Sequence, residues 1–589
     1  MIIKGQLMIW KNKCLLKLCS TASSPWERRK GGEVYWEFKR KNNSLIYPSY
    51  IINLRHYDNF IKLTMKHLVI LFLLAPWTLA AQTTYDVVIK NGRLIDGTGN
   101  GWFYADIAVK DGRIMLVQKN INATAKKTID ATGLVVAPGF IDVHTHIEGD
   151  ELKTPTADNF IYDGVTTVIA GNCGASNIDM GKYFTWIDSL QLSVNVASLI
   201  GHNDVRKTVM GRVNRDATEA ELQQMEKLVT QAMQDGAVGL STGLIYIPGT
   251  YSKTEEVVRL AKAAAKYNGV YATHMRDEGD SVTQAIQEAL HIGREAGMPV
   301  EISHFKLSGQ QNWGRSKETI PMIIQARKQG LDVTIDQYPY TASSTSLSTL
   351  IPDEILADGQ DSINARLNQP DIRKQVIEKM LRKLKNRKLK HFSYAVVAYY
   401  KADTTLNGKS IEAINLLKGR KHKAREEAIT ILEMMQQGGA GMVFHGMSEE
   451  DVKRIMQYPF NMFASDASIR AYRQGAPHPR GYGTNARVLA KYVRDEHVIT
   501  LEEAIRRMTS LPAQKFQLKD RGILKEGLAA DIVVFNEQEV ADLSTFEQPH
   551  QYSKGFVYVL VNGQLVVDAA RHTGVRSGRS LRGQGYQNK

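Results

Sequence analysis

The feature that most constrains the fold is an alternation of short apolar segments with helical stretches through the middle of the 589-residue chain. Apolar segments of four to seven residues indicate buried strands, and stretches with helical spacing, such as 219–235 and 253–267, lie between them. This order is typical of parallel strands joined by crossover helices, and eight such strands predict a closed (β/α)8 TIM-type barrel. The expected strands cover residues 140–144, 166–170, 194–200, 237–240, 269–273, 299–303, 332–336 and 461–465.

The two ends of the chain have a different, β-rich texture. Residues 82–137 and 515–589 contain short strands separated by pairs that favour tight hairpin turns. These pairs are Asn91-Gly92, Asp111-Gly112, Thr132-Gly133 and Asn562-Gly563. We therefore expect an α/β fold in which a small β-sandwich domain, built from both chain ends, accompanies a barrel over 138–514. A ninth strand candidate at 441–444 follows a polar and helical stretch, about 352–440, which we interpret as an insertion before the last barrel strand.

Residues of metal-binding type stand at the ends of the expected strands, where barrel enzymes place their sites. A histidine pair at i and i+2 on one strand shares a face, although such a pair is as compatible with buried structural histidines. A lone cysteine is by itself more often a small core residue. Six nitrogen, sulfur and oxygen donors at strand ends favour a metal site over packing: His144, His146, Cys173, His274, His304 and Asp466. We assign loop or hydrogen-bonding roles to His202, His422, His445 and His478.

A set of motifs resembles the D-aminoacylase branch of the amidohydrolase superfamily, in order from about residue 85 to about residue 582. The motifs are PGFIDVHTH, GNCG, GLSTGLIYIPG, THMRDE, ISHFK, YPYTASST, FASD and HPRGYGT. Cys173 stands where many relatives use a carboxylated lysine. One departure is Ile147, which stands directly after the His-X-His motif where relatives often have an acidic residue.

The resemblance implies two metal positions. A tightly bound Zn²⁺ would be held by Cys173, His274 and His304. A second, weaker site would use His144, His146 and Asp466, with Cys173 able to bridge.

The resemblance also implies zinc-dependent hydrolysis of N-acyl-D-amino acids to a carboxylate and a free D-amino acid. Asp466 would act as the general base, because amide hydrolysis needs a group that takes a proton from water and passes it to the leaving amine. Arg480, Lys306 and Tyr246 would bind the substrate carboxylate, with Tyr338 and Ser343 as weaker candidates. The alternatives are solvated surface charges for Arg480 and Lys306, and ordinary packing for Tyr246.

Three other functions remain open. A hydantoinase- or dihydroorotase-like cyclic-amide hydrolase usually carries a bridging lysine on the fourth strand, whereas here that strand ends in Ser241-Thr242-Gly243. A D-amino-acid dipeptidase of the same superfamily is the second. The third is a periplasmic zinc-binding protein without catalysis, against which Asp466 argues, since metal storage needs no acid–base group.

The charge distribution and the targeting signals limit which partners and which cellular compartment we expect. The net charge is +14, but residues 1–64 hold 12 Lys/Arg against 4 Asp/Glu, and Arg571 to Lys589 adds five more positive charges without an acid. The middle is close to neutral, so we expect no nucleic-acid partner. The partner that the resemblance implies is a small-molecule substrate. Of Cys14, Cys19 and Cys173, only Cys173 lies in the expected globular part. The oligomeric state stays open.

Residues 65–81 have the basic start, short apolar run and small residues of a signal peptide, too short to span a bilayer. We therefore expect a periplasmic or secreted protein without a membrane span after processing. Because a signal peptide belongs at an N-terminus, we interpret residues 1–64 as a mis-assigned start or a disordered leader. The alternative is a genuine cytoplasmic tail ahead of an uncleaved anchor.

Overall fold

A computed structural model describes residues 26–30, 33–37 and 84–587, and the chain divides into two units, Met1–Gln82 and Thr83–Lys589. In the first unit, β1 (Trp26–Lys30) pairs antiparallel with β2 (Glu33–Glu37). The expected signal peptide at 65–81 lies outside the described residues. Over the described part of the chain, every helix is too short or too polar to cross a bilayer.

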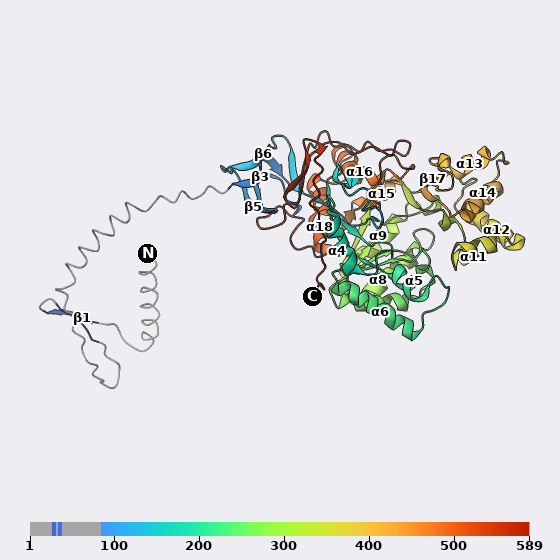
Figure 1. Ribbon diagram of the computed structural model, residues 1–589, viewed down its shortest axis with the longest axis horizontal. Helices are drawn as coiled ribbons and strands as arrows, with labels where there is room; N and C mark the ends of the chain where they lie inside the picture. The colour runs from blue at the N-terminus through green and yellow to red at the C-terminus, as the bar shows by residue number, and fades with distance from the viewer. Residues whose placement is uncertain (1–25, 31–32, 38–83, 588–589) are drawn as a thin grey trace, which may run out of the picture. The chain divides into compact units, whose positions relative to one another are not determined.

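The second unit, which holds the labelled elements from β3 onward in Figure 1, contains the expected barrel. Its strands follow the predicted order, with the third split at Leu199 into two short pieces. The strands are β8 (Phe140–Asp142), β9 (Val165–Ala170), β10 (Asn195–Ser198), β11 (Ile200–Gly201), β12 (Gly239–Gly243), β13 (Val270–His274), β14 (Val300–Ile302), β15 (Val333–Gln337) and β19 (Asn461–Phe463). Neighbouring strands are parallel, and a parallel bridge between Thr145 and Ala467 joins the last strand to the first. The ring of strands is therefore closed.

Helices connect successive strands of the ring, and several of them bury an apolar stripe, as α6 (Glu219–Gln234) and α8 (Val282–Ala296) do. α6 begins at a capping box in which Thr218 and Glu221 satisfy each other's backbone N–H groups, and it buries Met225, Val229 and Met233 at helical spacing. The other helices of the barrel are α3 (Asp158–Ile161), α4 (Met180–Leu190), α5 (His202–Met210), α7 (Thr254–Ala265), α8 (Val282–Ala296), α9 (Ser316–Lys328), α15 (Glu449–Met456), α16 (Arg480–Arg487), α17 (Leu501–Met508) and α18 (Ser510–Lys515).

Strands from both chain ends form one nine-stranded sheet around a small core of its own. They are β3 (Tyr85–Leu94), β4 (Phe103–Lys110), β5 (Arg113–Gln118), β6 (Ala125–Asp130), β7 (Val135–Pro138), β20 (Ile532–Phe535), β21 (Phe556–Val561), β22 (Gln564–Asp568) and β23 (Arg571–His572). The pairs Asp111-Gly112 and Asn562-Gly563 form the expected hairpin turns, each with two positive φ angles. This sheet packs on the barrel through an edge-to-face contact of Phe140 with Phe556.

Two of the expected hairpin turns are wrong. Asn91 and Gly92 lie inside the continuous strand β3 as a bulge, because the Asn91 N–H donates to Asp106 and its side chain to Asp130. The Thr132-Gly133 turn joins β6 to β7, but both strands pair in parallel with β3 and not with each other.

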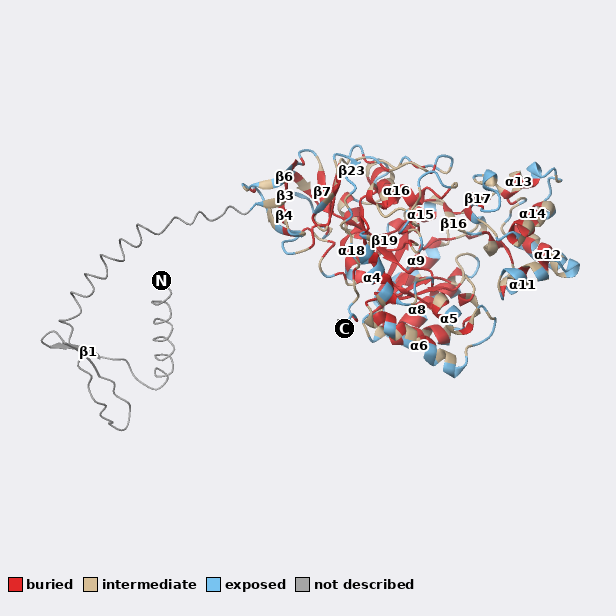
Figure 2. Cartoon of the chain, in the orientation of Figure 1, coloured by how far each residue is buried: buried red, intermediate tan, exposed pale blue. Residues whose placement is uncertain are grey.

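The insertion, residues 342–445, has its own sheet and its own apolar cluster, visible as buried ribbon in Figure 2. In it, β18 (Gly441–His445), the ninth strand candidate, pairs antiparallel with β16 (Ala342–Ser346) and β17 (Ala395–Tyr399). Its helices are α10 (Asp353–Leu356), α11 (Gln360–Leu367), α12 (Pro370–Asn386), α13 (Ile411–Leu417) and α14 (Ala424–Gln436).

The C-terminal tail runs beneath the barrel, although the sequence assigned it to the small sheet domain. The Val196 N–H donates to the Arg579 carbonyl at 3.0 Å, and the Gly583 N–H donates to the Gly236 carbonyl at 2.8 Å. Val196 lies near the start of β10 and Gly236 precedes β12, so the tail covers the ends of the strands opposite the site.

Candidate active site

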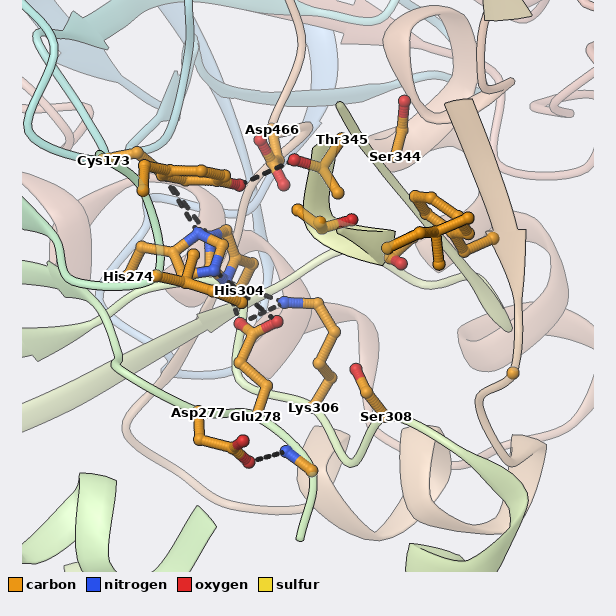
Figure 3. A pocket seen from close by; sticks show the side chains of 18 of the residues that line it. Cys173, His274, Asp277, Glu278, His304, Lys306, Ser308, Ser344, Thr345 and Asp466 are labelled. Atoms are coloured by element: carbon orange, nitrogen blue, oxygen red, sulfur yellow. Dashed lines mark hydrogen bonds and ion pairs between the residues drawn. The ribbon is translucent and has the colours of Figure 1, made fainter. Parts of the chain in front are cut away.

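Cys173, His274 and His304 converge at the carboxyl ends of β9, β13 and β14. The Cys173 sulfur lies 3.6 Å from His274 Nδ1 and 3.6 Å from His304 Nε2, and all three side chains are buried. Figure 3 shows them pointing toward one another. Tetrahedral zinc with bonds of about 2.3 Å to sulfur and about 2.0–2.1 Å to nitrogen needs sulfur and nitrogen about 3.6 Å apart. The residues present therefore fit a zinc ion.

His144, His146 and Asp466 adjoin this triad and complete the expected donor set. Asp466 Oδ1 lies 3.2 Å from His146 Nε2 and 3.7 Å from His144 Nε2. Cys173 Sγ lies 3.3 Å from His144 Nε2, so the sulfur borders both groups of donors. The six residues that the sequence selected thus meet around one small volume.

The backbone holds three of these donors in the left-handed region, with φ angles of 51° at Cys173, 37° at His304 and 48° at Asp466. Non-glycine residues adopt this region at a cost of about 1–2 kcal/mol. Such conformations persist only where surrounding contacts fix them, and they gather at functional sites. The strain marks the donor loops as specialised for orienting their side chains.

Glu278 is a residue of this site that the sequence analysis did not single out, although it lies in the quoted THMRDE motif. Its Oε1 lies 2.8 Å from His304 Nδ1 and 2.5 Å from Lys306 Nζ, as Figure 3 shows. Its Oε2 lies 3.8 Å from His274 Nε2. A carboxylate on the far nitrogen of a ligand histidine leaves the near nitrogen free for metal.

Asp336 plays the same part behind the other donors. Its Oδ2 lies 3.3 Å from His144 Nδ1, and its Oδ1 accepts the His304 N–H at 2.9 Å. Asp336 lies in β15, near the carboxyl end of the seventh barrel strand. Asp336 therefore has the same sequence signal as Asp466, a carboxylate near the carboxyl end of a barrel strand.

Asp466 is ionised in this environment. Burial alone would raise its pKa, but Arg480, with Nη1 2.8 Å from Asp466 Oδ2, and the neighbouring histidines hold the pKa of Asp466 well below its usual range. Burial raises the pKa of the Cys173 thiol well above its usual range, and nearby carboxylates add to the effect. Without a bound cation the neutral thiol of Cys173 is therefore favoured.

The donors open into a pocket of about 1120 Å³ that all five expected substrate contacts line. Tyr338 is buried and its hydroxyl has no hydrogen-bond partner among the described residues. The Tyr246 hydroxyl lies 2.8 Å from Thr345 Oγ1, and Ser343 stands two residues before Thr345 in β16. Burial raises the pKa of both tyrosines well above the usual range, so both hydroxyls stay protonated and can donate.

Two basic side chains of the pocket are already partly engaged. Lys306 contacts Glu278, and its Nζ also lies 2.8 Å from His304 Nδ1. Arg480 stacks over the Tyr338 ring at 4.4 Å and donates from Nη2 to the Ser344 carbonyl at 3.3 Å. Its buried Nε has no hydrogen-bond partner in the described part of the chain. Arg480 thus keeps an unsatisfied donor beside Asp466.

Two of the histidines set aside earlier have ordinary hydrogen-bonding roles. His202 Nε2 lies 2.8 Å from Glu256, and His478 accepts the Arg480 backbone N–H at 3.0 Å. The third, His445, borders the pocket at the end of β18. Glu148, next to Ile147, accepts the Gly171 N–H, and burial raises its pKa to about 7.

Comparison with known proteins decides the family. The model of the amidohydrolase family matches residues 127–567. The chain belongs to the amidohydrolase family. A D-aminoacylase of Alcaligenes xylosoxydans xylosoxydans is 35% identical over 520 residues, which cover 84% of this chain and 97% of the relative.

Solved structures agree with this family assignment. A D-aminoacylase structure, described as having a binuclear metal centre with one-metal activation and second-metal attenuation, is 34% identical with a TM-score of 0.72, covering 85% of this chain and 100% of its own. An N-acyl-D-glutamate deacylase from Bordetella bronchiseptica, solved with zinc and a phosphonate inhibitor, is 34% identical with a TM-score of 0.73 over the same shares. This amidohydrolase is therefore a hydrolase with the barrel that the sequence predicted.

Proposed function

We propose that this amidohydrolase removes the acyl group from N-acyl-D-amino acids in a zinc-dependent reaction. The observation that carries the proposal is the convergence of Cys173, His274 and His304 beside an ionised Asp466 that is paired with Arg480. The relatives named D-aminoacylase and N-acyl-D-glutamate deacylase support the substrate class.

The zinc ion would be held tightly by Cys173, His274 and His304, and a second, weaker ion by His144, His146 and Asp466 with the Cys173 sulfur between them. A divalent zinc ion there supplies Lewis acidity, which polarises a carbonyl and makes a water molecule nucleophilic near neutral pH. Glu278 and Asp336 orient His304 and His144 for this task.

Asp466 moves the proton in this reaction. Its carboxylate accepts a proton from the attacking water and delivers it to the nitrogen of the leaving amine, which completes cleavage of the amide bond. Its low pKa keeps the accepting form present throughout the neutral range. General acid–base catalysis of this kind contributes about 10²–10⁴-fold.

The substrate carboxylate would be bound on the far side of the scissile bond. Arg480 offers its unsatisfied Nε, and Tyr338 offers a buried hydroxyl without a partner. Lys306, Tyr246 and Ser343 border the same pocket and would complete the polar contacts. With the carbonyl and the carboxylate both fixed, the side chain of only one enantiomer points into open space, which is the basis for the proposed D preference.

The test is a substrate panel with the purified protein. N-acyl-D-amino acids, their L enantiomers, D-dipeptides, hydantoins and dihydroorotate are compared under identical zinc conditions. We expect the N-acyl-D-amino acids to give the highest kcat/KM. Faster turnover of a cyclic amide or a D-dipeptide would replace the proposal by that activity, and no turnover of any N-acyl-D-amino acid would contradict the proposed substrate class.

We also propose that the protein is exported, on the signal-peptide pattern of residues 65–81. The mature chain would then begin near Ala81 or Gln82 and act in the periplasm or outside the cell. N-terminal sequencing of protein from the native host tests this. A mature protein that retains residues of 1–64 would contradict it.

A further inference from the structure

The insertion contains a second cluster of metal-binding side chains, away from the barrel site. His391, Glu412, His422 and Glu427 each offer one donor atom, and these atoms all lie within 4.8 Å of one another. We propose that this cluster is a binding site for a divalent transition-metal ion such as Zn²⁺.

The four donors are held together by contacts between histidine nitrogens and glutamate oxygens. His391 Nδ1 lies 2.6 Å from Glu427 Oε1 and 3.7 Å from Glu412 Oε1, while His422 Nε2 lies 2.5 Å from the same Glu412 oxygen. The two imidazole rings stack with centroids 4.1 Å apart and planes 21° apart. Tetrahedral zinc with nitrogen and oxygen ligands needs donors about 3.3 Å apart. The observed separations bracket that distance.

One half of the cluster is rigid and the other half is adaptable. The Glu427 side chain is fully buried, and its second oxygen accepts the Phe392 N–H at 2.7 Å. The His422 side chain is 54% exposed, so it can adjust without disturbing the core and leaves the donors open to ions from solution. A fixed carboxylate with an accessible partner suits the capture of an ion.

The chemistry of the donors selects the class of ion. Two carboxylates balance the charge of a divalent cation, and two neutral imidazoles complete four ligands. Imidazole favours Zn²⁺, Cu²⁺ or Ni²⁺, whereas Ca²⁺ and Mg²⁺ prefer oxygen ligands throughout. Zn²⁺ is therefore the first probe.

An ion here would tie together three segments of the insertion. His391 follows α12, Glu412 lies in the first turn of α13, and Glu427 lies in the first turn of α14, which is adjacent to α13 in Figure 1. Leu389 and Tyr394, on either side of His391, line the active-site pocket. The ion would thus fix a stretch of backbone that forms part of the pocket wall.

The test counts zinc per chain in the full-length protein, by elemental analysis after equilibrium dialysis against Zn²⁺. We expect His422→Ala and Glu412→Gln each to lose one equivalent. Glu433→Gln is the matched control, because Glu433 lies on α14 but pairs with Lys418 and Arg420 outside the cluster. The control should keep the full zinc content of the wild type.

A double variant separates this site from the barrel site. Cys173→Ser should lose zinc from the barrel, and adding His422→Ala should remove one further equivalent. Equal zinc content with and without His422→Ala, in either background, would overturn the proposal. The count is independent of deacylase activity, so it stands or falls separately from the proposed function.

Discussion

At the scale of single residues, Arg480 has two proposed roles. One substitution tests both, because each role is read out by a different measurement. Arg480 faces the proposed position of the substrate carboxylate and also pairs with Asp466 at 2.8 Å. In Arg480→Gln, burial is no longer opposed by that charge, so the pKa of Asp466 rises and its proton-accepting form is lost at a higher pH. An arginine beside an aspartate lowers its pKa by about 1–3 units, which sets the expected size of the change.

We therefore predict that the acid limb of the kcat/KM profile moves to higher pH in Arg480→Gln, by about 1–3 units. Activity at neutral pH falls at least tenfold, because a charge-assisted hydrogen bond to the substrate, worth about 1.5–3 kcal/mol, is also lost. Zinc content stays at the wild-type value. An unchanged acid limb would mean that Arg480 does not control Asp466.

Glu278 tests the importance of the residues behind the ligands. Its contact with His304 Nδ1 at 2.8 Å keeps the ligand nitrogen directed at the metal. Loss of such an orienting carboxylate typically costs about 10–100-fold in metal affinity. We predict that reduction for Glu278→Gln, measured by competition with a zinc chelator.

The control for Glu278→Gln is Glu288→Gln, because Glu288 pairs with Arg276 and touches none of the six ligands. It should retain wild-type zinc affinity. Equal affinity in both variants would show that His304 is oriented without Glu278.

At the scale of elements, the loop after β9 is fixed by a glycine that allows no substituent. Gly171 has φ +76°, and a Cβ there would come within 2.1 Å of the Leu199 carbonyl oxygen. Gly133 has nearly the same φ, +75°, but a Cβ there would meet nothing within 4 Å. The two positions separate backbone strain from steric clash.

We predict that Gly133→Ala lowers the free energy of unfolding by about 1–2 kcal/mol, the cost of the left-handed conformation for alanine. Gly171→Ala should cost more and should also weaken zinc binding, since Cys173 lies two residues further on. Denaturant unfolding and zinc titration measure the two effects. Equal costs and unchanged zinc binding in both variants would show that the loop can move aside.

The sequence predicts elements well where periodicity and position carry the information. The expected strand ends predict that all six donors lie close together, because the parallel strands of a barrel present their carboxyl ends on one face. The pair Asn91-Gly92 suits both a hairpin turn and a bulge, and only the contacts with Asp106 and Asp130 decide between them. The sequence does not predict Glu278 as a site residue, because its role depends on side-chain distances that the spacing of residues along the chain does not encode.

At the scale of the whole molecule, the fold assembles one site from distant parts of the chain. The barrel supplies the candidate metal ligands, α16 supplies Arg480, and the insertion supplies Ser343 and part of the pocket wall. The sheet built from both chain ends and the C-terminal tail contact the barrel on the side opposite the site. Residues of the insertion that line the pocket can therefore be exchanged without moving the candidate metal ligands, which lie on the barrel.

The most direct test of this account is the hydrolysis of an N-acyl-D-amino acid and its L enantiomer before and after removal of metal. Activity on the D enantiomer should be lost with a chelator and return with Zn²⁺, because Cys173, His274 and His304 offer sulfur and nitrogen donors that suit a zinc ion. The D enantiomer should be preferred by at least about tenfold, the value of one charge-assisted hydrogen bond. Hydrolysis that survives full metal removal, or equal rates for both enantiomers, would contradict the account.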